Sequence, residues 1–243
     1  LGVSHFQREK LLGREIDVLN FKWMWQTFWV TFWGEAKNPI AWYRHQVFPT
    51  FKKLGWGFLV TIILAIAGFL IGWQLVDFFP LPTQVSSVEE LNANMQSLID
   101  AAYFSQSAVS FILVQNLRVI LLAGILGSLT FGLAGTIPLL TTFAAVGYLI
   151  NLLTSGGIPL SYLLALLLPH GIIELPALIL TVTATLYAAA KVLAPSKNKG
   201  IGEVWLEAIA VWFKITLGIC VPAFILAAFI EAFLTPQVVL WLF

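Results

Sequence analysis

Five long apolar stretches constrain this chain more than any other feature of its sequence. They cover residues 55–79, 108–133, 136–153, 171–194 and 204–233. A helix needs about 20 apolar residues to cross the hydrocarbon core of a bilayer, so each stretch is a candidate for one membrane crossing. The sequence therefore predicts an all-α, polytopic transmembrane helix bundle with about five spanning helices.

Composition supports the same fold class and excludes others. Apolar residues make up 59% of the 243 residues, and charged residues only 10%, whereas soluble domains are about 45–50% apolar and about 25% charged. Too little polar surface is left for a soluble enzyme. The formal net charge is +1, so no strong field attracts nucleic acid, and no nucleic-acid partner is expected.

The charges are distributed unevenly and predict the orientation of the chain. Eight of the 13 basic residues lie within residues 1–53, and a second basic group surrounds the loop at 191–203. Residues 77–107 hold four acidic residues and no Lys or Arg. Because basic loops stay in the cytoplasm, we expect these two basic regions to be cytoplasmic. Residues 80–107 and the C-terminus are then expected outside a cytoplasmic (plasma) membrane.

Residues 1–53 precede the transmembrane domain as a separate cytoplasmic segment. Seven aromatic residues fall within residues 21–33, and basic residues accompany them. Such side chains favour the headgroup level of a bilayer, so we expect an interfacial amphipathic helix. The alternative is a helix packed on the cytoplasmic ends of the bundle. Residues 54–236 form the expected transmembrane domain, and residues 237–243 a C-terminal tail.

A proline and a glycine interrupt the apolar run around the fourth span. Residues 161–168 are apolar but too short to cross a bilayer, and Pro169, His170 and Gly171 follow them. Proline lacks an amide donor and glycine is a poor helix former, so the sequence predicts a helix break at Pro169–Gly171. The segment before Pro169 is expected to be a short re-entrant or half-helix at the outer face.

The few polar side chains inside the predicted spans are the candidates for a functional site, because such groups usually face the bundle interior or a cavity. We expect Arg118 and Lys214 near mid-depth, each with a carboxylate partner. Glu174 is the preferred partner of Arg118, and Glu231 is the alternative. The whole predicted cluster comprises Asn116, Arg118, His170, Glu174, Lys214 and Glu231.

Metal and catalytic chemistry find little support in the sequence. His170 and Glu174 are one helical turn apart, but two ligands do not make a zinc site, which needs three or four. A structural role and a functional polar site both stay open for this pair. The chain has no G-x-S-x-G, H-E-x-x-H or P-loop sequence, so no catalytic residue is assigned. We therefore expect a non-enzymatic protein without a metal or a cofactor.

Three stretches of the sequence carry more distinctive motifs. Residues 111–140 hold Asn116, Arg118 and a series of glycines. Residues 168–180 read LPHGIIELPALIL, with a Pro-His-Gly, a glutamate three residues after that glycine, and then Pro-Ala. Residues 230–236 read IEAFLTP, a glutamate followed by an aromatic residue and a proline. In this order and spacing, the three stretches resemble the stage II sporulation protein M family.

The resemblance covers roughly residues 48–236 and has two departures. Thr142 and Phe143 stand where the family usually has an Asn-Gly pair, and Ala232 stands where a glycine is common. The resemblance implies a multi-pass, non-enzymatic protein of the cytoplasmic membrane. The sporulation member of the family is associated, as a membrane anchor, with an envelope-remodelling complex of peptidoglycan hydrolases. Some relatives resemble membrane partners of transport ATPases.

The expected function is therefore that of a membrane scaffold or anchor for partner proteins in envelope remodelling. The alternative is a permease-like subunit of a transporter that works with a separate ATPase. Expected partners are the lipid bilayer and other membrane or envelope proteins, with a transport ATPase in the alternative case. Glycine-rich helix faces allow close helix contacts, which leaves a homodimer open.

Overall fold

The computed structural model describes residues 20–79, 87–100, 106–195 and 199–243. Every regular element in these ranges is a helix, which confirms the all-α fold. Five helical stretches of the described chain are long and apolar enough to cross a membrane: Gly55–Phe78, Ser107–Leu129, Ala134–Ser155, Leu160–Leu193 and Ile201–Leu242. The elements of these stretches are α5 (Gly55–Phe78), α7 (Gln106–Leu129), η2 (Ala134–Thr136), α8 (Ile137–Ser155), α9 (Leu160–Leu193), α10 (Ile201–Ile215), η3 (Thr216–Cys220), α11 (Val221–Phe229), η4 (Ile230–Leu234) and α12 (Thr235–Leu242).

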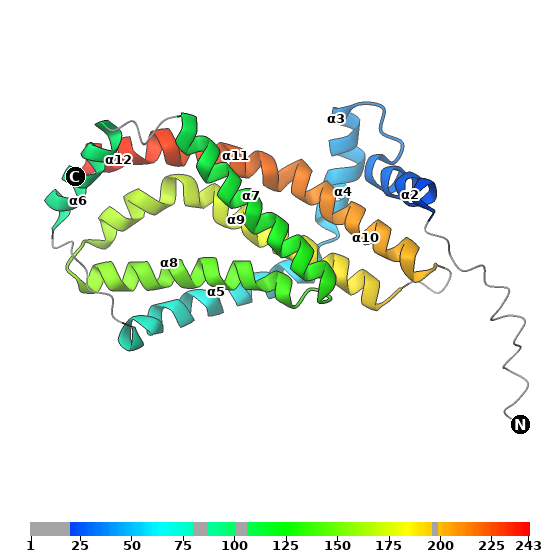
Figure 1. Ribbon diagram of the computed structural model, residues 1–243, viewed down its shortest axis with the longest axis horizontal. Coiled ribbons are helices and arrows are strands. Elements are labelled where there is room, and N and C mark those ends of the chain that lie inside the picture. The colour runs from blue at the N-terminus through cyan, green and yellow to red at the C-terminus, as the bar shows by residue number, and fades with distance from the viewer. Residues whose placement is uncertain (1–19, 80–86, 101–105, 196–198) are drawn as a thin grey trace, which may run out of the picture.

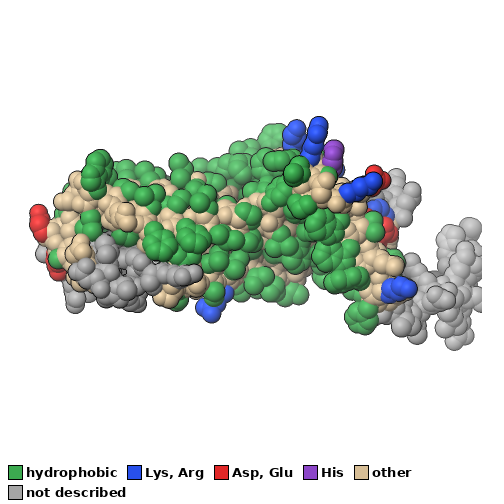
Figure 2. Space-filling model, turned by 90° about the horizontal axis from the view of Figure 1, so that it is seen from above, with side chains coloured by type: hydrophobic (Ala, Val, Ile, Leu, Met, Phe, Trp, Pro, Cys, Tyr) green, Lys and Arg blue, Asp and Glu red, His purple; other side chains and the backbone are tan. Residues whose placement is uncertain are grey.

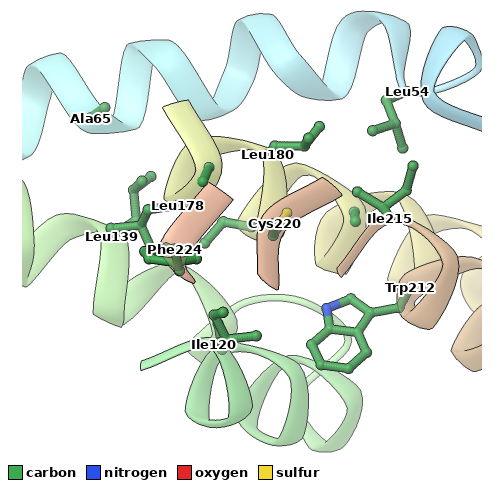
Figure 3. Close-up of a cluster of buried hydrophobic side chains, with 14 residues drawn as sticks. Leu54, Ala65, Ile120, Leu139, Leu178, Leu180, Trp212, Ile215, Cys220 and Phe224 are labelled. Atoms are coloured by element: carbon green, nitrogen blue, oxygen red, sulfur yellow. The ribbon is translucent and has the colours of Figure 1, made fainter. Parts of the chain in front are cut away.

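Helix α9 lies at the centre of the bundle, where α5, α7, α8, α10, α11 and α12 all contact it (Figure 1). Its side chains Leu178 and Leu180 meet Ile120 of α7, Leu139 of α8 and Phe224 of α11 in the main buried cluster (Figure 3). Apolar side chains also cover much of the outer surface, while most basic groups lie toward one end and acidic groups lie at both ends (Figure 2). Such a surface suits a bilayer and not water.

The expected helix break at Pro169–Gly171 is not present. Helix α9 runs without interruption for 34 residues from Leu160, with Pro169 and Pro176 inside it, so the expected half-helix at 161–168 forms its first turns. A straight helix of this length would measure about 51 Å, but α9 bends in its first half (Figure 1). A proline removes one backbone hydrogen bond and bends a helix, and neighbouring helices make such a site tolerable within a membrane.

Helices α5 and α8 approach each other at backbone distance. A Cβ atom at Gly72 of α5 would overlap the carbonyl oxygen of Ala144, and one at Gly147 of α8 would overlap that of Phe69. Small residues let spanning helices come this close, and van der Waals contact then replaces the hydrophobic effect that lipid cannot supply. The two helices therefore form one unit through their glycines.

The N-terminal segment packs on the bundle along one face. Its elements are α2 (Phe21–Trp33), α3 (Pro39–Trp42), η1 (Tyr43–Val47) and α4 (Phe48–Lys52). Phe32, Trp42 and Val47 are buried against Ala210 of α10, and the indole nitrogen of Trp42 donates to the Phe32 carbonyl oxygen at 2.7 Å. Packing on the bundle was the alternative expectation for this segment. Other aromatic side chains stay exposed, Phe21 at 72% among them, so an interfacial role for that face stays a prediction.

At the opposite end, the last helix and the loop helix α6 (Val88–Asp100) join the bundle. Residues 237–243 were expected to be a tail, but most of them belong to α12, and Val239 is fully buried. The hydroxyl of Tyr162 in α9 lies 3.1 Å from Asn92 Oδ1 of α6, to which it donates a hydrogen bond. The start of α6 therefore rests on the bundle.

The arrangement of the ends gives a test of the predicted orientation. Figure 1 places α2–α4 and the start of α10 at one end and α6 and the C-terminus at the other. With Ala93→Cys in α6 and Gly200→Cys before α10, both exposed positions, we expect an impermeant maleimide to label them from opposite sides of the membrane. Wild-type protein is the control, because Cys220 is buried. Labelling of both from one side would contradict five crossings.

Candidate functional site

Three of the predicted polar residues meet between α9 and η4. His170 and Glu174 lie four residues apart on α9, and Glu231 lies in η4. One imidazole nitrogen and one oxygen from each carboxylate lie within 4.8 Å of one another, and all three side chains are partly buried. The structure thus brings together side chains that are 57 residues apart in the sequence, from Glu174 to Glu231.

Local structure explains why these side chains converge. Residues at positions i and i+4 share one helix face, which aligns His170 with Glu174. Glu231 lies in a π-helical turn, a rare feature that occurs frequently at functional sites. One turn later, Thr235 is buried at the start of α12, and its Oγ1 lies 3.3 Å from His170 Nδ1. Two i, i+4 polar pairs, one on each helix, therefore face each other.

Asn116 of α7 borders the same group. Its side-chain amide lies near the Glu174 carboxyl. Its Nδ2 is nevertheless buried and has no partner at hydrogen-bonding distance. A buried donor without a partner costs free energy, so a further acceptor or a small shift of Glu174 is favoured here. We refer to His170, Glu174, Glu231, Thr235 and Asn116 as the polar cluster.

The polar cluster holds two carboxylates, and no Lys or Arg among the described residues pairs with them. The salt bridges of the described chain join Lys199 to Glu203, at 3.7 Å, and to Glu207, outside the predicted hydrophobic spans. Lys199 also donates a hydrogen bond to Glu207, and this bond raises the pKa of Lys199. Two neighbouring carboxylates away from water resist full ionisation. The cluster is therefore suited to take up a proton or a cation.

Arg118 does not join the polar cluster, and its expected ion pair with Glu174 is not formed. Arg118 is exposed, and the described chain contains no acidic group within salt-bridge distance of it. The reason lies in helix geometry, because each residue turns the helix by about 100°. Asn116, two residues earlier, faces the cluster, so Arg118 points to the opposite side of α7. Depth along the helix was predictable, but the direction of the side chain was not.

Lys214 also lies elsewhere, and its partner is not a carboxylate. It is buried, with 6% of its surface exposed, and its Nζ donates to Gln46 Oε1 at 2.8 Å. Gln46 belongs to η1 in the N-terminal segment. Lys214 therefore anchors that segment to α10, which the sequence analysis did not anticipate because Gln46 lies 168 residues away along the chain.

A separate cavity of about 210 Å³ lies between α7, α9 and α10. Its lining is almost wholly apolar, and none of the six predicted polar residues contributes to it. The glycines of α7 pack within the chain beside it: a Cβ atom at Gly124 would collide with the ring of Trp212, and one at Gly127 with the Thr185 methyl group. These glycines therefore give no separate support for a homodimer, which stays a prediction.

Sequence reasoning missed Thr235 and the role of Glu231 as a third neighbour of His170 and Glu174. The signal was present, because Glu231 and Thr235 repeat the i, i+4 spacing of His170 and Glu174. A polar pair with that spacing in each of two apolar helices favours a shared site, since lipid offers no other partner.

The fold and the site together define a polytopic α-helical membrane protein with a polar cluster inside its bundle. The family model described as Stage II sporulation protein M matches residues 58–236, a range that contains the whole cluster. An uncharacterized protein of Methanocaldococcus jannaschii is 31% identical over 188 residues, covering 76% of this chain and 96% of that relative. The chain belongs to the stage II sporulation protein M family. No solved structure matches it.

Proposed function

We propose that this protein is a non-enzymatic membrane scaffold or anchor that holds a partner protein through a contact inside the bilayer. The observation that supports it most strongly is Arg118, which is exposed and forms no salt bridge with any residue that the structure describes. It lies in the middle of the spanning stretch Ser107–Leu129, 11 residues from either end, which corresponds to about 16 Å along the helix. An arginine side chain is too short to bring its charge from there to the headgroups.

The surroundings of Arg118 make its charge costly without a partner. Val114, Leu121 and Ile125 lie on the same side of α7 and are 47%, 51% and 54% exposed. Lipid tails cannot solvate a guanidinium group at this depth, so charged groups in spanning helices pair with other groups. A spanning helix that carries an Asp or Glu would satisfy Arg118 with two parallel hydrogen bonds.

The partner is proposed to be a different protein and not a second copy. Within the described residues, the carboxylates in the interior of the predicted spans are Glu174 and Glu231. Both are partly buried between α9 and η4, so a second copy presents no free carboxylate to Arg118. Leu121 and Ile125, one and two turns further along α7, also line the apolar cavity. That cavity gives an apolar side chain of the partner helix a place to pack.

Replacing Arg118 by leucine is expected to leave the fold intact and to release the partner. A photo-crosslinking amino acid at Leu122, 50% exposed on this face, should capture one protein with an acidic residue in its spanning helix. Arg118→Leu should reduce that adduct about tenfold or more, because removing one partner of a buried pair costs about 3–5 kcal/mol. Arg118→Lys keeps the charge but not the two parallel hydrogen bonds, so it should retain more of the adduct than Arg118→Leu and less than wild type. The unfolding temperature in detergent should not fall in either variant.

The controls separate this proposal from its competitors. The same crosslinker at Ile66 on the exposed side of α5, 55% exposed, should give no such adduct. An adduct with twice the mass of the chain would indicate a second copy and contradict the proposal. If Arg118→Leu leaves the yield of the adduct unchanged, the contact with the partner does not depend on the charge of Arg118.

A permease-like subunit that works with a separate ATPase is the second candidate. The polar cluster favours it, since transporters place carboxylates and bent helices near the middle of the membrane. The apolar cavity favours it less, because Arg118, His170, Glu174 and Lys214 are all absent from its lining. Identification of the crosslinked partner as an ATPase, together with loss of substrate uptake in Glu174→Gln, would decide for this candidate.

A further inference from the structure

We propose that the polar cluster binds one divalent first-row transition metal ion, with His170, Glu174 and Glu231 as the protein ligands. One imidazole and two carboxylates form a mixed nitrogen and oxygen set, which suits ions such as Zn²⁺ and Co²⁺. The sequence offered only two ligands one turn apart, and the third comes from a different helix. This site is independent of Arg118 and of the proposed partner.

The separation of the ligand atoms fits such an ion after a small adjustment. Bonds of about 2.0–2.1 Å in tetrahedral geometry place the ligand atoms about 3.4 Å apart. The three atoms lie at most 4.8 Å apart in the structure, so side-chain rotations that bring them up to about 1.4 Å closer complete the site. Three protein ligands leave a fourth position for water, as in many zinc sites.

Thr235 and Asn116 hold two of the ligands in orientation. Ligating histidines use their second ring nitrogen in a hydrogen bond, which fixes the tautomer and the ring. His170 Nδ1 lies 3.3 Å from the Thr235 hydroxyl, so Nε2 is the nitrogen assigned to the ion. The unpartnered Nδ2 of Asn116 is close to Glu174, so a small shift of this carboxylate on binding also gives Asn116 its missing acceptor.

The charge of a divalent cation matches that of the two carboxylates in their ionised form. Two ionised carboxylates within a low-dielectric bundle carry two negative charges, and the described chain supplies no salt bridge to either. A divalent ion neutralises both ionised carboxylates at once, and it binds in competition with the protons that would otherwise neutralise them. The ion would also link α9 to the η4–α12 segment, and through Asn116 to α7, so that binding stabilises the bundle.

The experiment uses the full chain without an affinity tag, purified in mild detergent and stripped with a chelator. Titration with Zn²⁺ is expected to show one ion bound per chain and a rise in unfolding temperature. Co²⁺ should give visible absorption bands of a four-coordinate nitrogen and oxygen site, and Mg²⁺ should give neither effect. A protein that binds no Zn²⁺ at micromolar concentrations, or gives only the spectrum of hydrated Co²⁺, overturns the proposal.

Matched variants locate the ion. His170→Gln, Glu174→Gln and Glu231→Gln should each weaken binding more than tenfold, while the exposed His45→Gln and Glu35→Gln should not. Thr235→Val keeps all three ligands and should weaken binding about tenfold, which separates orientation from misfolding. If the ligand variants bind Zn²⁺ as tightly as the control variants, the bound zinc is an adventitious ion only, and the proposal is overturned. Because no partner is needed, these results are independent of the scaffold test.

Discussion

A single methyl group at Gly72 is expected to destabilise the bundle more than any other one-carbon change. The Cβ atom of Gly72→Ala would overlap the Ala144 carbonyl oxygen of α8, and a backbone atom cannot rotate away as a side chain can. The helices must separate, which also loosens the contact of Gly147 with Phe69. Overpacking of this kind costs about 1–3 kcal/mol, occasionally more, and we expect the upper end of that range. Reversible unfolding in mixed micelles with sodium dodecyl sulfate measures it.

Gly171→Ala is the matched control, because Gly171 also lies inside a spanning helix. Its Cβ atom would contact only Leu175 Cδ1, at 3.9 Å. Alanine is a better helix former than glycine by about 0.5–1 kcal/mol, so this variant should be as stable as wild type or slightly more stable. If the two alanine variants unfold at the same fraction of sodium dodecyl sulfate, α5 and α8 do not approach each other at backbone distance.

The sequence predicted the spanning helices because their main signal, a run of about 20 apolar residues, depends on composition alone. Pro169 misled the prediction for α9. In water, a proline inside a helix leaves polar groups that solvent can satisfy in many ways, whereas in a bilayer the helix is the only available hydrogen-bonded state. Helix α9 therefore continues and bends, and the 161–168 segment joins the span instead of forming a half-helix.

The site was only partly predictable, because lipid removes the usual difference between inside and outside. In a soluble helix, polar residues mark the outer face, but both faces of α7 are apolar, and the exposed Leu121 resembles the buried Ile120. The depth of Arg118 could be counted, while its direction away from Glu174 could not. The spacing of His170 and Glu174 was informative, since an i, i+4 pair shares a face in any environment.

Long-range contacts escaped the sequence analysis for a different reason. Lys214 was expected to need a carboxylate, but the N-terminal segment supplies Gln46 instead. Nothing in the residues around Lys214 encodes that segment, which docks through its own buried aromatics, Phe32 and Trp42. The position of one element thus decided the partner of a residue in another.

Replacing Trp212 by alanine is expected to open the junction of α7, α9 and α10. Trp212 is 8% exposed and belongs to the main buried cluster, where it projects from α10 toward α7 (Figure 3). Its indole nitrogen donates to Thr185 Oγ1 at 2.9 Å. Loss of a buried tryptophan costs about 3–5 kcal/mol, and here the space would merge with the cavity of about 210 Å³ that Trp212 already lines.

Two further variants separate the ring from its hydrogen bond in the same unfolding assay. Trp212→Phe removes the indole donor and also reduces the ring, whose outer atoms lie over Gly124. Thr185 still donates to the Thr181 carbonyl oxygen at 3.0 Å, so the lost hydrogen bond costs about 1 kcal/mol, and with the smaller ring the total loss should stay below that of Trp212→Ala. Trp241→Ala changes a side chain that is 84% exposed and should stay within about 0.5 kcal/mol of wild type. If Trp212→Ala and Trp241→Ala lose equal free energy of unfolding, the junction of α7, α9 and α10 does not depend on Trp212. Gly124 would then not be needed to make room for the Trp212 ring.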